Sequence, residues 1–198
     1  MPEAHTRKKA PAAVRRSLLD HAANLAAEQG INAVTTQAVA AGAGVTKGGL
    51  FHHFASKDAL LDAMVTDILG QLDEVIDARM AIDPEPHGAF TRAYVTCALG
   101  PEHHDLGRAW KALGVSLAAE ERLLCLWSEW LRDRLRRHAA TDGARIHEIV
   151  RLAADGAWLT QGEGEGRSPE ALQELRLALE HLTRPGAPLP SQAPTTTH

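Results

Sequence analysis

The chain has 198 residues, 44% of them hydrophobic and 23% charged, the composition of an ordinary globular protein with one or two domains. No apolar run reaches the roughly 20 residues that cross a bilayer, and no apolar block follows the basic N-terminal residues. We therefore expect a cytoplasmic protein with no secretory signal and no membrane contact. The net charge of −4 is uneven: residues 1–60 hold seven basic and four acidic side chains, and residues 61–198 hold 14 and 21. A basic front on an acidic body is typical of an N-terminal part that binds a polyanion.

The first 30 residues predict a polar arm followed by one helix. Residues 1–10 are basic, and we expect a disordered arm whose Arg7, Lys8 and Lys9 can touch phosphates. From Pro11 the apolar residues recur at helical spacing, which predicts a helix over 12–29 with the stripe Val14, Leu18, Ala22 and Leu25. Gly30 is a typical helix stop.

A short helix, a tight turn and a second short helix are predicted next. Thr35 is a good N-cap for a helix over 36–42, Gly44 suits a sharp turn, and Thr46 caps a helix over 46–53. Ser56 then caps a long helix over 56–80. The outer face of the second short helix carries Thr46, Lys47, His52 and His53, as in a module that enters a DNA groove.

The rest of the chain predicts more helices and no convincing strand. The apolar periodicity indicates helices over 87–99, 103–118, 119–140 and 144–161, and a last one that opens at Ser168-Pro169-Glu170. This gives an all-α protein of nine helices, with a DNA-binding domain over 11–55 and a helical body over 56–184. The helix over 56–80 links the two domains, and the proline-rich residues 185–198 predict a disordered tail.

The stretch from Thr35 to Leu61, TTQAVAAGAGVTKGGLFHHFASKDALL, resembles the DNA-binding module of the TetR family of transcriptional regulators. The family pattern has a capping Thr, an apolar-Ala pair, Ala-Gly-Val-Ser/Thr at the turn, a Gly, an aromatic-His-Phe run and Ser-Lys. The matching residues here are Thr35, Val39-Ala40, Ala43-Gly44-Val45-Thr46, Gly48, Phe51-His52-His53-Phe54 and Ser56-Lys57. Over the remaining two thirds of the chain, only the plan of nine helices matches the family.

This resemblance implies a ligand-responsive repressor that binds double-stranded DNA as a homodimer on a quasi-palindromic operator and is released by an unknown small molecule. The residues expected at the DNA are Thr35, Thr36, Gln37, Thr46, Lys47, Gly48, Gly49, Phe51, His52, His53 and Lys57. Position 51 is often Tyr in the family, where the hydroxyl reaches a phosphate. Phe51 lacks that hydroxyl, so we expect it to pack on a sugar or a thymine methyl.

The body offers candidates for an effector pocket and for a dimer interface. In relatives, the helices that carry the four tryptophans surround a ligand cavity, and the predicted lining is Met64, Tyr94, His104, Trp110, Leu113, Trp127, Trp130 and Trp158. The predicted dimer residues lie on the last two helices: Ile149, Ala153, Gly156, Ala157, Leu172, Leu175, Leu179 and Leu182. Both sets have a plain alternative, since tryptophan stripes and leucine seams also fill a monomer's own core.

Other classes of function have less support. His87, His103 and His104 match no standard metal-site spacing, and no second thiol accompanies Cys97, so we expect no metal and no cofactor. The chain has no nucleophile elbow, phosphate loop or zinc motif, so we expect no enzyme. Cys97 and Cys125 are expected to be small buried residues in a reducing compartment. A helical interaction protein or a metal sensor that responds to no small organic ligand stays open as the alternative.

Overall fold

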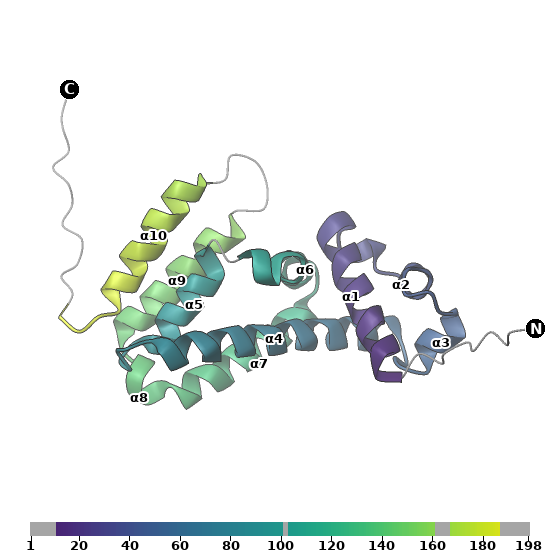
Figure 1. The fold of residues 1–198 in the computed structure, drawn as a ribbon, viewed down its shortest axis with the longest axis horizontal. Coiled ribbons are helices and arrows are strands. Elements are labelled where there is room, and N and C mark those ends of the chain that lie inside the picture. Colours follow the sequence, from purple (N-terminus) through teal and green to yellow (C-terminus); the bar gives the residue numbers. More distant parts are fainter. Residues whose placement is uncertain (1–10, 101–102, 161–166, 187–198) are drawn as a thin grey trace, which may run out of the picture. The chain divides into compact units, whose positions relative to one another are not determined.

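A computed structural model describes residues 11–100, 103–160 and 167–186, with the backbone but not the side chains of residues 103–108, 111 and 115. These ranges contain ten α-helices, one 3₁₀ helix and no strand, which confirms the all-α prediction (Figure 1). The predicted arm, residues 1–10, lies outside the described residues, as does the predicted tail beyond Gly186. None of the described helices is long and apolar enough to cross a membrane.

The chain forms two compact units. One takes the described residues of Met1–Gly70 and Gly107–Glu129, and the other those of Gln71–Leu106 and Trp130–His198. Three helices contribute residues to both units: α4 (Lys57–Ile82), α6 (His103–Ala119) and α7 (Glu121–Arg137). The functional division expected at residue 55 stays a prediction.

The first unit begins with α1 (Pro11–Gln29), which packs against the 3₁₀ helix η1 (Ile31–Ala33) and against α2 (Thr36–Gly42) (Figure 1). The helix α2 packs in turn against α3 (Lys47–Phe51). Leu18 and Ala22 of the predicted stripe on α1 are fully buried, and Val14 and Leu25 are half-buried. The core of this unit also contains Val39, Ala40, Leu50, Phe54, Leu60 and Leu61.

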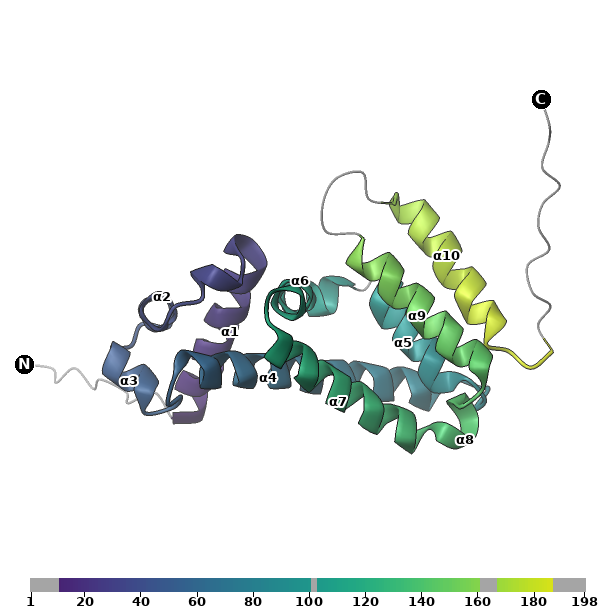
Figure 2. The same cartoon turned by 180° about the vertical axis from the view of Figure 1, so that it is seen from behind.

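The second unit is built on three helices that lie side by side in both views: α5 (Ala89–Leu99), α9 (Arg145–Leu159) and α10 (Pro169–Leu182) (Figures 1 and 2). A short fourth helix, α8 (Ala139–Asp142), packs against α5. Nearly every residue of α5 is buried, so this helix is the centre of the unit.

The prediction of one helix over 119–140 is wrong, because α7 ends at Arg137 and α8 is separate. His138 breaks the helix with φ −106° and ψ 17°. The break brings Asp142 to the first turn of α5, where its Oδ1 accepts hydrogen bonds from the Thr91 N–H at 2.8 Å and the Thr91 hydroxyl at 2.6 Å. The buried Arg151 of α9 donates to the same hydroxyl at 2.8 Å. These long-range bonds favour the break, which raises the number of helices in the described ranges from the predicted nine to ten.

The two cysteines have different environments. Cys97 is buried, as predicted, but Cys125 is exposed. On α7 the core residues are Leu123 and Trp127, which are four apart and share one face. Cys125 lies midway between them in sequence and so points to the opposite face, which makes the prediction of its burial wrong.

Candidate nucleic-acid interface

Three side-chain caps fix the starts of α2, α3 and α4. The Thr35 hydroxyl accepts from the Ala38 N–H at 3.1 Å, and the Thr46 hydroxyl accepts from the Gly49 N–H at 3.0 Å. The Ser56 hydroxyl accepts from the Ala59 N–H at 3.0 Å at the start of α4. Each bond satisfies a backbone donor that has no partner within the helix, so the predicted caps on α2, α3 and α4 are confirmed.

The turn between α2 and α3 depends on one glycine. Gly44 has φ +68°, a left-handed conformation that other residues rarely adopt. Its N–H donates to the Ala41 carbonyl at 3.1 Å, and the Val45 N–H donates to the Ala40 carbonyl at 3.0 Å. The chain therefore reverses within a few residues, and α3 follows α2 as in a helix-turn-helix.

The predicted DNA residues stay accessible in this unit. Leu50 and Phe54 are buried and hold α3 to the core, as expected. None of the predicted contact residues is buried. The exposed ones are Thr35, Gln37, Thr46, Lys47, Gly48, Phe51 and His52, and the half-buried ones are Thr36, Gly49, His53 and Lys57.

The surface of α3 is shorter and flatter than its sequence suggested. The helix ends at Phe51 instead of at residue 53, although His52 keeps near-helical angles of φ −69° and ψ −20°. The Phe51 ring is 43% exposed, and the Lys47 Nζ lies 5.9 Å from its centroid. A Cβ added at Gly48 would meet only the Thr46 hydroxyl, at 3.8 Å, so the protein's own packing does not require a glycine there. Without a side chain at Gly48, the surface of α3 leaves room for a close approach by another molecule.

The predicted effector residues are divided between the two units. Met64, Trp110, Leu113 and Trp127 are buried in the first unit, while Tyr94, Trp130 and Trp158 belong to the second. The Trp130 Nε1–H donates to Asp73 at 3.0 Å, and the Tyr94 hydroxyl donates to Asp155. The side chain of His104 lies outside the described residues. The pocket around Arg92 and the pocket around His147 contain none of these residues, and the effector pocket stays a prediction.

Tyr94 and Asp155 form a polar pair in an apolar setting. Burial raises the pKa of the Tyr94 hydroxyl well above its ordinary value, and the neighbouring Asp155 adds to this effect. Burial also raises the pKa of the Asp155 carboxyl, although the hydrogen bond from Tyr94 and the charge of Arg151 oppose the rise. Both groups therefore favour their neutral forms more than they would in water.

The predicted dimer residues divide by exposure. Ala157 and Leu179 are buried within the protomer, where they pack in its own core, and Leu172, Leu175 and Leu182 are half-buried. Ile149, Ala153 and Gly156 of α9 are exposed. Three further large apolar side chains of these helices are exposed and are absent from the predicted set: Leu152 and Leu159 of α9 and Leu177 of α10. The sequence shows the helical spacing of these apolar residues. Which of them remain exposed depends on how α5, α9 and α10 pack against one another.

In the part of the chain that the structure describes, no three His, Cys, Asp or Glu side chains come close enough to hold a metal ion. The side chains of His103 and His104 are outside that part. His87 instead lies with its ring 4.9 Å from the ring of the buried His147.

Comparison with known proteins identifies the family. Residues 18–64 match the family model of bacterial regulatory proteins, tetR family, and residues 88–184 match a tetracyclin repressor-like C-terminal domain. The regulator BetI of Rhizobium meliloti is 31% identical over 159 aligned residues, covering 74% of this chain and 77% of BetI. The chain belongs to the TetR family. TetR-family proteins are transcriptional regulators and not enzymes.

Two further comparisons are narrower in what they show. The repressor KstR2 of Rhodococcus jostii is 39% identical over 66 aligned residues, but the match spans 31% of this chain and only 32% of the length of KstR2. The crystal structure of the multidrug binding protein EbrR with malachite green aligns with a TM-score of 0.67 at 22% identity, covering 86% of this chain and 98% of EbrR. This second likeness concerns the fold alone.

Proposed function

We propose that this TetR-family protein is a ligand-responsive transcriptional repressor that binds operator DNA through α2, α3 and the start of α4. The observation that carries the proposal is the capped helix-turn-helix, in which Leu50 and Phe54 are buried while Lys47 and His52 are exposed. A helix anchored on one side and accessible on the other is suited to the major groove.

The contacts divide by chemistry. Thr35, Thr36 and Lys57 lie at helix N-termini, where N–H groups and side chains bind phosphate oxygens and fix the register on the duplex. We assign Gln37, Lys47 and His52 to base edges, because their side chains are exposed and polar. Gly48 and Gly49 let the backbone of α3 approach the DNA closely.

A dimer is the second part of the proposal. One helix-turn-helix covers only a half-site, so a quasi-palindromic operator needs two copies of the chain. The exposed apolar residues of α9 and α10 offer a self-complementary surface for a twofold partner. The side chains that support this are Ile149, Leu152, Leu159 and Leu177, with Ala153 and Gly156 allowing close helix approach.

The third part of the proposal is a small-molecule effector. It shifts the equilibrium between a form that binds DNA and a form that is released from it. The likeness in fold to EbrR, whose structure holds malachite green, supports a ligand site in the helical body. The predicted lining with its tryptophans remains our candidate for this site. Native mass spectrometry of the purified protein would detect a retained effector directly.

The DNA-binding proposal is tested by Lys47→Ala. We expect the variant to keep its fold and its oligomeric state but to lose at least about tenfold in affinity, because a charge-assisted contact contributes roughly 1.5–3 kcal/mol. The measurement is a fluorescence anisotropy titration at physiological salt, with an operator selected from random duplex DNA. Arg136→Ala on α7, where the side chain is 72% exposed, is the matched control and should bind normally. Equal affinities for the two variants would contradict the assignment of Lys47.

A further inference from the structure

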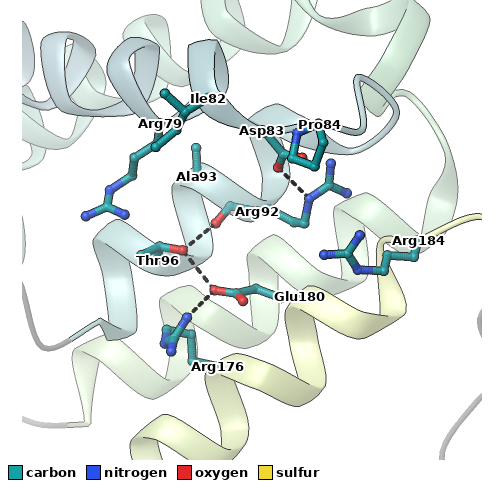
Figure 3. A pocket seen from close by; sticks show the side chains of 10 residues that line it. All are labelled: Arg79, Ile82, Asp83, Pro84, Arg92, Ala93, Thr96, Arg176, Glu180 and Arg184. Carbon is teal, nitrogen blue, oxygen red and sulfur yellow. Dashed lines mark hydrogen bonds and ion pairs between the residues drawn. The ribbon is translucent and has the colours of Figure 1, made fainter.

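A second-unit pocket separate from the predicted effector residues is lined by an unusual number of arginines. It lies among the end of α4, the residues that follow it, α5 and α10, and has a volume of about 330 Å³ (Figure 3). Its lining is Arg79, Ile82, Asp83, Pro84, Arg92, Ala93, Thr96, Arg176, Glu180 and Arg184. The six ionisable side chains in this set are four guanidinium groups and two carboxylates, which gives a formal charge of +2.

One wall of the pocket is rigid because Arg92 holds it together. The side chain of Arg92 is only 6% exposed. Its Nε donates to Asp83 at 2.8 Å, and its terminal nitrogens donate to the carbonyls of His87 and Glu85 and to the Thr183 hydroxyl. Gly88 makes room for this cluster: it has φ +76°, and a Cβ there would lie 2.9 Å from both the Arg92 guanidinium and the Thr183 carbonyl oxygen. The pocket is therefore formed before any ligand arrives.

The two carboxylates already have partners within the protein. Asp83 is paired with Arg92, and Glu180 accepts from Arg176 at 2.6 Å and from the Thr96 hydroxyl at 2.8 Å (Figure 3). Burial opposes ionisation of Asp83, but the hydrogen bonds from Arg92 and the Glu85 N–H, helped by the charge of Arg184, keep the pKa of this carboxyl below its ordinary value. Each carboxylate of the lining is thus held by an arginine of the same lining, and the ten residues together have a formal charge of +2.

The neighbouring Cys97 does not balance this excess. Burial raises the pKa of the Cys97 thiol to about 11, although the nearby Arg79 works in the opposite direction. The thiol is thus protonated and uncharged at neutral pH. Figure 3 shows the Arg184 side chain reaching from the end of α10 toward Arg92 and Glu180, so its positive charge faces the same space.

We propose that this pocket binds a small organic oxyanion, a molecule with a carboxylate or phosphate head and a short aliphatic body. Guanidinium groups bind such heads through paired N–H donors in a fixed planar geometry. Ile82, Pro84 and Ala93 supply an apolar wall for the aliphatic part. A volume near 330 Å³ is at the small end of ligand pockets and suits a molecule with few heavy atoms. Binding of this anion does not depend on whether the protein binds DNA.

Isothermal titration of the full-length protein with succinate and with inorganic phosphate tests the proposal and distinguishes the two kinds of head. We expect saturable binding of at least one of them, weakening as sodium chloride is raised because salt screens the attraction. The uncharged succinamide should not bind. No saturable binding of either anion, or equal binding of succinamide and succinate, would overturn the proposal.

Three variants place the binding in this pocket. Arg184→Gln removes an exposed charge and should weaken binding about tenfold, whereas Glu180→Gln raises the formal charge of the lining to +3 and should strengthen binding severalfold. Arg145→Gln is the matched control. Arg145 does not line this pocket, but it lines a neighbouring pocket that shares Arg184 with it. The site is refuted if Arg145→Gln changes the affinity for the anion as much as Arg184→Gln does. It is also refuted if neither Arg184→Gln nor Glu180→Gln changes that affinity. Thermal unfolding of each variant confirms that it is folded.

Discussion

At the scale of single residues, position 51 is where this chain departs from its family. The family pattern often has Tyr there, and the hydroxyl reaches a phosphate. Phe51 keeps the ring, 43% exposed, next to the Lys47 ammonium at 5.9 Å. A cation over an aromatic face is weakly attracted to it, so the ring can steady the lysine while contributing no hydrogen bond itself.

Phe51→Tyr should therefore strengthen operator binding. A restored phosphate contact contributes about 0.5–1.5 kcal/mol, which corresponds to roughly a twofold to tenfold lower Kd. Anisotropy titrations of the two proteins on the selected operator measure the change. The variant's stability should not change, because the added hydroxyl faces solvent. A weaker affinity would instead indicate that the Phe51 ring packs against an apolar part of the DNA.

At the scale of elements, α8 ties three parts of the second unit together. Asp142 at its end is 2% exposed and accepts from both the N–H and the hydroxyl of Thr91 on α5. Arg151 on α9 donates to the Thr91 hydroxyl and, at 3.4 Å, to the Asp142 carbonyl. Burial lowers the pKa of the Arg151 guanidinium, and the charge of Asp142 opposes that effect. The buried cation thus depends on the buried carboxylate.

Asp142→Ala should lower the free energy of unfolding by about 3–5 kcal/mol, because it removes the largest negative charge acting on the buried Arg151 guanidinium and leaves the Thr91 N–H without its acceptor. Urea unfolding at one fixed protein concentration measures the change. Asp133→Ala on α7 is the control, since Asp133 is 57% exposed and pairs only with the exposed Arg136 in the described structure. Such a surface pair contributes about 1 kcal/mol or less. Similar losses for both variants would show that the Asp142 network is not important for stability.

At the scale of the whole molecule, the protomer leaves an apolar face of α9 and α10 uncovered. Ile149, Leu152 and Leu159 on α9 are 52–64% exposed, and Leu177 on α10 is 50% exposed. Ile149, Leu152 and Leu159 lie on one face of α9 by their helical spacing, and a row of exposed apolar side chains is typical of a protein interface. Gly156 belongs to the same surface, and a Cβ added there meets no atom within 4 Å in the protomer.

Gly156→Leu should consequently leave the protomer folded but prevent close helix approach in the dimer. We expect light scattering at micromolar concentration to show a monomer, and operator affinity to fall at least about tenfold because only one half-site is engaged. Gly70→Leu on α4 is the matched control, since Gly70 is also exposed with nothing within 4 Å of an added Cβ. A wild-type protein that is itself monomeric, or a Gly156→Leu variant that remains dimeric, would refute this interface.

Most of the helix-turn-helix could be predicted from the sequence because its determinants are local. The caps at Thr35, Thr46 and Ser56 each join residues three apart, and Gly44 satisfies the conformation of its own backbone. Apolar periodicity likewise predicted nearly all of the helices, since a helical stripe repeats every three to four residues. The same local signals carried the resemblance to the TetR family.

Only the tertiary structure decided the features that join distant residues. The break before α8 follows from bonds between Thr91 and Asp142, which are 51 residues apart, and the arginine pocket is held by a bond from Arg92 to Thr183, 91 residues away. Arg92 stands within the apolar run of α5, so the sequence indicated a buried arginine there. It did not indicate which groups bind that arginine. The all-α fold, the capped module and the family could be predicted from the sequence, because each depends on residues that are neighbours along the chain. Which apolar stripe stays exposed and which charges meet in one pocket depend on how the helices pack, and no periodicity specifies that.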